Sequence, residues 1–286
     1  MVKKAIVTCL ALFVLYSVFV ITIKPWWWKA AQHQWQNNKV SAQNVFYADS
    51  AYSSIIVGSS MSERVHIDSA PGIYNLALSG LSIFDGLNVI TRSNKYPKKV
   101  FVEINVITRD TNQDFSSSMF SPVLMPLRKY FVALRERNQP IAALGTRLYN
   151  HVSDWTDVHL KPAPKSKAAE VNRKSIYTTN LAMHKKEYNS IPDVTLLHNN
   201  FELLHQYLAQ LEAHNVQVIF FEMPVDNQLQ EMPMPKAVRK AFLQQFPKDK
   251  YRYIFLPDSV AFETVDGIHL TADGARQYSA YFKQNM

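Results

Sequence analysis

Short, uninterrupted apolar runs are the sequence feature that most limits the folds open to this chain. Longer segments separate five such runs: Ser54–Val57, Ile73–Leu76, Val100–Ile104, Val216–Phe221 and Tyr253–Leu256. A short strand that is apolar without alternation is buried on both faces, as in a parallel sheet covered by helices. The runs therefore predict a mostly parallel sheet of about five strands.

Helical patterns lie between these runs. Residues Ser79–Asn94 are expected to form a turn followed by a helix. Apolar residues then recur every three or four positions before the fourth run, at Leu197, Phe201, Leu204, Leu208 and Leu211. The last helix is expected over Thr271–Gln284, with Thr271 as its N-cap. Alternating strands and helices predict an α/β fold, a three-layer doubly wound sandwich with flavodoxin-like strand order.

The N-terminal segment is expected to lie in a membrane. Residues Ala5–Ile23 contain no charge and number 19, close to the roughly 20 needed to cross a bilayer. Two lysines precede the segment, and Lys24 with the tryptophans Trp26–Trp28 follows it. We expect residues 1–4 to be a cytoplasmic tip, 5–23 an uncleaved anchor in a bacterial inner membrane, and the rest periplasmic. The alternative is a cleaved signal peptide, which needs a shorter apolar core and a small-residue cleavage site.

The remaining chain is expected to divide into a stalk and one domain. Residues 24–50 are polar enough for a stalk or a first surface helix, and 51–286 form the α/β domain. Residues 108–193 interrupt the alternation without a good strand, although a helix is expected near Leu124–Arg137. Within Lys161–Lys174 there are five basic residues and one acidic residue. This insertion is either a solvated segment or a cap that borders the active site and faces an anionic surface.

Residues suited to acyl transfer follow the first three predicted strands. They are Gly58-Ser59-Ser60, Ser79-Gly80 and Asn105. In open α/β sheets, ligands bind outside the carboxyl ends of the strands. A serine there can be a nucleophile, and a glycine N–H or an asparagine amide can donate to an oxyanion. Each of these features alone is common in ordinary loops and turns.

A second group lies just before the last helix. His269 could take a proton from a serine hydroxyl, and Asp266, three residues earlier, could orient the imidazole. A helix-capping loop would have the same spacing, so Asp-x-x-His alone does not identify a catalytic pair.

Taken together, Ser60, Gly80, Asn105 and His269 follow one another in the order that names the SGNH (GDSL-type) hydrolase superfamily, which this chain resembles over Ser53–Asn105 and Val216–Met286. The resemblance implies that Ser60 is the nucleophile, His269 the base and Asp266 its orienting acid. It also implies an oxyanion hole made by the N–H of Ser60, Gly80 and Asn105.

Two positions depart from the family pattern. Ser59 stands where the family has aspartate beside the nucleophile, and Glu103 stands where the third block usually has glycine. Gly-Ser-Ser behind a single anchor is similar to the extracytoplasmic proteins of teichoic-acid D-alanylation and alginate O-acetylation. Those proteins work beside membrane-bound O-acyltransferases, which would make such an enzyme a possible partner.

The sequence thus predicts a membrane-anchored serine enzyme that transfers an acyl group, such as acetyl, to a cell-surface polysaccharide or removes one. The alternative is a non-catalytic SGNH-like subunit that binds within a polysaccharide-modification or export complex. The net charge of +8 favours an anionic glycan or a lipid-linked polymer as partner. An exported domain meets these before nucleic acid, so no nucleic-acid partner is expected.

No cofactor or metal ion is expected. Cys9 is the only cysteine, which excludes an intrachain disulfide and a cysteine metal cluster, and there is no His-Glu-x-x-His motif. The phosphate-binding glycine loop of nucleotide enzymes is missing too.

Overall fold

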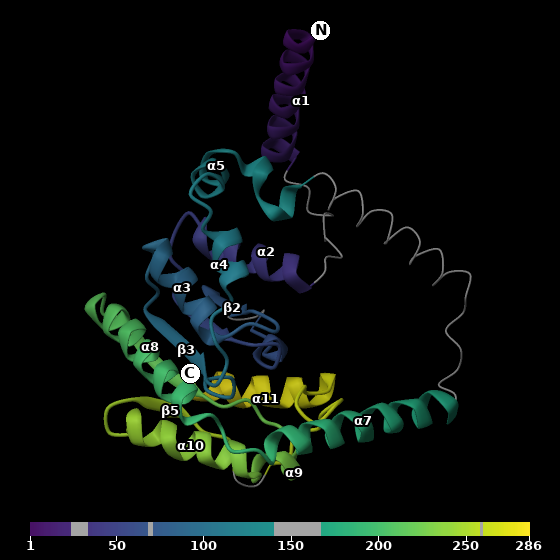
Figure 1. Ribbon diagram of the computed structural model, residues 1–286, viewed down its shortest axis with the longest axis vertical. Helices are drawn as coiled ribbons and strands as arrows, with labels where there is room; N and C mark the ends of the chain where they lie inside the picture. The colour runs from purple at the N-terminus through teal and green to yellow at the C-terminus, as the bar shows by residue number, and fades with distance from the viewer. Residues whose placement is uncertain (24–33, 68–70, 140–166, 258–259) are drawn as a thin grey trace. The chain divides into compact units, whose positions relative to one another are not determined.

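The computed structural model describes residues 1–23, 34–67, 71–139, 167–257 and 260–286, without the side chains of 167–173 (Figure 1). These residues belong to two compact units. The N-terminal unit combines Met1–Tyr47 with Gln113–Pro164, and the sheet unit combines Ala48–Asn112 with Lys165–Met286. The predicted tryptophan triplet lies outside the described residues, as do residues 161–166 of the basic stretch Lys161–Lys174.

The sheet unit contains one open, all-parallel sheet. Its strands are β1 (Ser54–Gly58), β2 (Ile73–Ala77), β3 (Lys99–Glu103), β4 (Gln217–Phe221) and β5 (Arg252–Ile254). They are arranged β2-β1-β3-β4-β5, the flavodoxin-like order. All five apolar runs are therefore strands, and the predicted α/β class with a mostly parallel sheet is confirmed. The fifth strand ends at Ile254, earlier than the predicted Leu256.

The register aligns the carboxyl ends of the central strands. Gly58 is paired with Ala77, Val57 with Val102, and Glu103 with Phe221. The segments that follow β1, β2, β3 and β4 consequently leave the sheet at one edge. This is the edge at which the sequence places Ser60, Gly80 and Asn105.

Helices pack on both faces of this sheet. Those of the sheet unit are η1 (Ser62–Arg64), α3 (Ile83–Ser93), α7 (Lys167–Tyr188), α8 (Val194–Ala213), α9 (Asn227–Gln230), α10 (Pro233–Gln245) and α11 (Ala272–Asn285). Phe220 of β4 packs on Phe242 of α10, while its neighbour Phe221 packs on Phe282 of α11. Because successive strand residues point to opposite faces, α10 and α11 lie on opposite sides. The complete three-layer sandwich stays a prediction.

The helix ends follow the sequence signals. Ser82 and Asp85 form a reciprocal capping box at the start of α3, and Thr271 caps α11 by accepting the N–H of Gly274 at 3.1 Å. α7 was not expected, because it lacks an apolar stripe. Of its described side chains only Leu181 is buried. Within the described parts of the insertion, 108–139 and 167–193, there is no strand.

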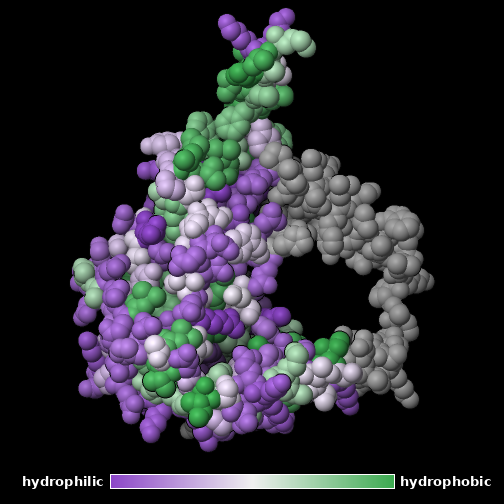
Figure 2. Space-filling model, viewed as in Figure 1, coloured by the Kyte–Doolittle hydropathy of each residue, from purple (hydrophilic) through white to green (hydrophobic). Residues whose placement is uncertain are grey.

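The N-terminal unit is helical where it is described. Its elements are α1 (Val2–Ile23), α2 (Gln34–Phe46), α4 (Gln113–Met119), α5 (Leu124–Tyr130), η2 (Val132–Leu134) and η3 (Glu136–Asn138). Residues Val2–Thr22 of α1 are long and apolar enough to cross a membrane, and almost all are exposed (Figure 2). The predicted limits of the anchor, the stalk and the insertion stay predictions.

One fold prediction concerns the contact between α3 and β1. A Cβ on Gly86 would lie 2.7 Å from Val57 Cγ1, an overpacking that costs about 1–3 kcal/mol. We expect Gly86→Ala to lower the free energy of unfolding of the full chain in detergent, measured by urea denaturation. The clash should outweigh the roughly 1 kcal/mol that alanine gains over glycine in a helix.

Val57→Ala provides the control background. It removes Cγ1 and leaves Cβ of residue 57 at 3.7 Å from the new methyl group, an ordinary contact. In this background Gly86→Ala should become neutral or stabilising. An equal loss in both backgrounds would contradict the close packing of α3 on β1.

Candidate active site

Three predicted catalytic side chains meet at the carboxyl edge of the sheet. Nε2 of His269 lies 2.8 Å from Oγ of Ser60, and Nδ1 of His269 lies 2.7 Å from Oδ2 of Asp266. Ser60 follows β1 by two residues, while Asp266 and His269 lie in the loop before α11. An antiparallel bridge between Thr264 and Leu270 closes this loop at its base. The structure thus forms a continuous chain of contacts from the hydroxyl to the carboxylate.

The loop holds Asp266 through its own backbone. Oδ1 of Asp266 accepts the N–H groups of Ile268, at 3.1 Å, and His269, at 2.8 Å. Gly267 makes this curl possible, with φ +101° and a Cβ position only 3.0 Å from Leu181 Cδ1. The carboxylate is therefore oriented before any substrate arrives.

The charge on Asp266 is stabilised in the folded protein. Burial acts to raise the pKa of Asp266, but the hydrogen bonds from His269 and Ile268 outweigh it and hold the pKa below its ordinary value. An ionised carboxylate only accepts hydrogen bonds, so Nδ1 of His269 carries its proton toward Asp266. Nε2 is then free to accept the hydroxyl proton of Ser60.

Ser59 and Glu103, the two positions that differ from the SGNH pattern, contact each other next to Ser60. Oε2 of Glu103 accepts the backbone N–H of Ser59 at 2.8 Å, and Oε1 accepts its hydroxyl at 3.0 Å. Both residues are fully buried. The carboxyl group that the turn lacks at position 59 is thus supplied from the end of β3. The sequence pointed to both positions but gave no sign that they form a pair.

Gly58 is required by this arrangement. A Cβ at this position would lie 2.4 Å from Oε2 of Glu103 and 2.1 Å from Oγ of Ser62. Only glycine leaves room for the carboxyl group to reach the backbone of the turn. This contact explains why an otherwise apolar strand ends in glycine followed by two serines.

The predicted oxyanion donors lie at the same edge of the sheet. Within the described residues, neither the N–H of Ser60 nor that of Gly80 makes a hydrogen bond, and Gly80 has φ +75°. Asn105 is pinned to the end of β4, since its Oδ1 accepts Met223 N–H at 2.7 Å and its Nδ2 donates to Met223 O at 3.0 Å. One hydrogen of that amide remains for a ligand. In the described part of the chain, no hydrogen bond joins Gly80 or Asn105 to the three residues of the triad.

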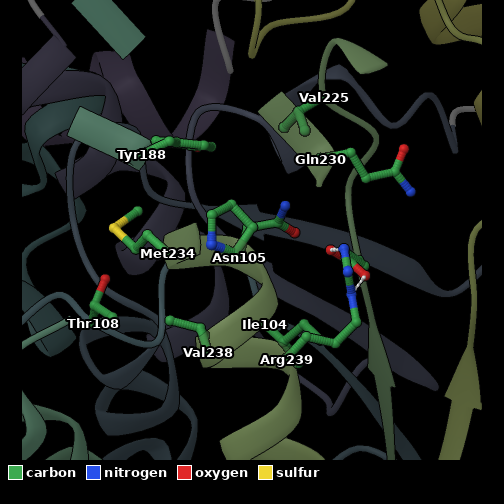
Figure 3. A pocket seen from close by; sticks show the side chains of 11 residues that line it. Ile104, Asn105, Thr108, Tyr188, Val225, Gln230, Met234, Val238 and Arg239 are labelled. Atoms are coloured by element: carbon green, nitrogen blue, oxygen red, sulfur yellow. Dashed lines mark hydrogen bonds and ion pairs between the residues drawn. The ribbon is translucent and has the colours of Figure 1, made fainter. Parts of the chain in front are cut away.

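A pocket lies beside Asn105 (Figure 3). It is small, with a cavity volume of about 30 Å³. Its lining comprises Ile104, Asn105, Thr108, Tyr188, Glu222, Val225, Gln230, Met234, Pro235, Val238 and Arg239. Arg239 is held by a bidentate ion pair with Glu222, at 2.6 and 3.1 Å. Burial, with the Glu187 carboxylate nearby, raises the pKa of Tyr188 to about 12.

No sequence pattern pointed to these pocket residues. Glu222 directly follows β4, so the rule that located Asn105 after β3 could also have found it. Tyr188 and Arg239 come from α7 and α10, and no local signal distinguishes them from surface residues. Within the described residues, no group of three or more histidine, cysteine or acidic side chains could hold a metal ion.

Neither a known protein-family model nor a curated protein sequence matches this chain. Function therefore has to be inferred from the side chains and their geometry.

The buried Glu103 carboxyl makes stability depend on pH. Burial raises the pKa of Glu103, against the opposing hydrogen bonds from Ser59 and Ser62. The folded state therefore keeps this proton at pH values where the unfolded chain, with an ordinary pKa of about 4.3, has lost it. We expect the contribution of Glu103 to the free energy of unfolding to be complete below the pKa of the unfolded chain. This contribution should be lost as pH rises through the raised pKa of the folded state.

Glu103→Gln should remove this dependence, because the amide cannot ionise yet still offers an oxygen to the N–H of Ser59. As pH rises, the free energy of unfolding of the wild type should fall relative to that of Glu103→Gln. Glu103→Ala is the matched comparison and should cost about 1–3 kcal/mol for each Ser59 group left unpaired. If the free energies of unfolding of the wild type and Glu103→Gln changed in parallel with pH, Glu103 would not be the group that makes stability depend on pH.

Proposed function

We propose that this protein is a membrane-anchored serine enzyme acting on acyl esters or thioesters. The single observation that carries the proposal is the contact chain Ser60–His269–Asp266, at 2.8 and 2.7 Å. Residues separated by 209 positions meet in the geometry that a weak hydroxyl nucleophile needs for activation. A structural histidine would not require a carboxylate on one ring nitrogen and a serine hydroxyl on the other.

In the first half-reaction, Oγ of Ser60 forms a bond to the acyl carbonyl carbon as its proton passes to Nε2 of His269. Asp266 stabilises the resulting imidazolium. The oxyanion is held by the N–H groups of Ser60 and Gly80 and by the remaining Asn105 hydrogen. The bond to the leaving oxygen or sulfur then breaks, and that atom takes the proton from His269.

In the second half-reaction, an acceptor hydroxyl gives its proton to His269 and its oxygen bonds to the acyl carbon. The bond from that carbon to Oγ of Ser60 then breaks, and Oγ takes the proton back from His269. A sugar hydroxyl would make the protein an O-acyltransferase, and water would make it an esterase. A small pocket is lined by Asn105, one of the three proposed oxyanion donors, which supports placing a small substrate group beside that amide. We favour transfer of acetyl or a similar acyl group to or from a capsule, exopolysaccharide or lipopolysaccharide.

We further propose that the chain is an SGNH-like hydrolase with a three-layer doubly wound domain. The parallel sheet, its strand order and the helices on both faces support this fold. The apolar helix α1 supports an anchor in a bacterial inner membrane with the sheet unit in the periplasm. A membrane-bound O-acyltransferase would be the natural acyl donor there.

Fluorophosphonate labelling and hydrolysis of p-nitrophenyl acetate test the triad. We expect the wild type to be labelled at Ser60, and Ser60→Ala to lose the label and about 10⁴- to 10⁶-fold of its turnover. Asp266→Asn should lose about 10⁴-fold, because the imidazole would be held in the wrong tautomer. Ser93→Ala, at the end of α3, is the matched control and should keep both label and activity.

A folded wild-type protein without label at Ser60 would overturn the enzymatic proposal. That result would instead favour a non-catalytic scaffold subunit of a polysaccharide-modification complex.

A separate prediction addresses Asn105. Asn105→Asp keeps an acceptor for the N–H of Met223 but loses the amide donor, so turnover should fall about 10²- to 10³-fold. The Michaelis constant should change little, while the thermal unfolding midpoint should fall, because Met223 O loses its donor. A loss of folding with unchanged specific activity of the folded fraction would assign Asn105 a structural role only.

A further inference from the structure

The segment after α4 in the N-terminal unit exposes apolar side chains in an unusual concentration. We call the side chains of Val123, Leu124, Leu127, Tyr130 and Phe131 the α5 apolar face. They are 67%, 41%, 38%, 74% and 42% exposed, respectively. Figure 2 shows hydrophobic side chains gathered over α5 and the adjoining part of α1. A concentrated exposed apolar surface marks a contact with a membrane or another molecule.

Two charged side chains of this segment point inward. Arg128 and Glu136 are each 4% exposed and form an ion pair at 3.4 Å. Lys39 of α2 also pairs with Glu136, at 2.6 Å, and Arg128 donates to Ser118 O at 3.0 Å. Lys129 and Arg137 remain exposed. A segment that buries two of its charges and exposes five apolar side chains differs from an ordinary water-facing surface.

The α5 apolar face is continuous with the candidate membrane helix. The rings of Phe13 and Phe131 lie 5.5 Å apart, and the Tyr16 hydroxyl donates to the carbonyl of Asn138. Phe13 precedes the last residue of α1, Ile23, by ten positions, which corresponds to about 15 Å along a helix. If α1 crosses a bilayer, Phe131 lies at the depth of the hydrocarbon.

The backbone of the segment is prepared for such an environment. Lipid offers no hydrogen bonds, so backbone groups that short helices leave open need partners within the protein. Side chains supply these partners at four carbonyls. Tyr47 donates to Met125 O, Arg135 to Arg128 O, Asn138 to Val132 O and Tyr16 to Asn138 O.

We propose that the α5 apolar face is embedded in the lipid leaflet at the C-terminal end of α1, as a second membrane contact. Lipid is the occupant because the surface continues that of α1 and its carbonyls are already capped. This inference depends on α1 and not on the chemistry of Ser60.

Site-specific fluorescence in vesicles tests the proposal on the full chain. In a Cys9→Ser background, Leu127→Cys and Tyr130→Cys are each labelled with an environment-sensitive fluorophore. The variants are reconstituted in phosphatidylethanolamine–phosphatidylglycerol vesicles with and without doxyl lipids. Native Cys9, exposed on α1, is the membrane reference, and Gln284→Cys, exposed on α11, is the aqueous reference. The two test positions are read separately, and circular dichroism checks the fold of each variant.

We expect emission at positions 127 and 130 to shift to the blue and to be quenched by doxyl lipids, as at Cys9 but not at position 284. Water-like, unquenched emission at both positions would overturn the proposal, whether or not Cys9 is quenched. A blue shift that persists in detergent, grows with protein concentration and resists doxyl lipids would also overturn it, because a second copy would then cover the surface.

Discussion

The contact between Glu103 and the turn after β1 is the constraint on which the candidate site depends. A fully buried carboxyl group is stable only when its oxygens are hydrogen-bonded, and here Ser59 donates its N–H to one oxygen and its hydroxyl to the other. These two hydrogen bonds fix the backbone immediately before Ser60. It also requires Gly58, because a side chain at that position would occupy the space of the carboxyl oxygen. Ser60 is consequently held by a turn that has little freedom to move.

The parallel register of the strands brings the remaining residues of the candidate site to the same edge of the sheet. Since β1, β3 and β4 end level with one another, Ser60, Asn105 and Met223 leave the sheet together, and the Asn105 amide can bridge to the next strand. The last helix, α11, packs on the sheet through Phe282 and brings the loop before it to the same edge. His269 thus reaches Ser60 through packing of apolar side chains far from the hydroxyl itself.

The sequence was sufficient for the strands and the N-cap of α11, because these depend on local patterns. It also pointed to Ser60, Asp266 and His269, the three side chains that the structure brings into contact. Apolar runs identify buried strands, and their order along the chain locates the loops that must gather at one edge. The pairing of Ser59 with Glu103 could not be predicted in this way. Each residue departs from the expected pattern by itself, and only their proximity makes them complementary. α7 was missed for a related reason, since its single buried residue, Leu181, gives no periodic signal.

Buried charge determines which groups face outward in both units. In the sheet unit, Glu103 draws the polar groups of Ser59 inward, while Ser60 faces the imidazole. In the N-terminal unit, the ion pair of Arg128 with Glu136 holds charge inside and leaves Leu127 and Tyr130 outside. Hydropathy patterns describe where apolar residues are buried. In a short irregular segment, however, the few buried polar atoms decide which side chains face outward. For that reason the sequence predicted a helix near Leu124–Arg137 without indicating that its apolar residues would face outward.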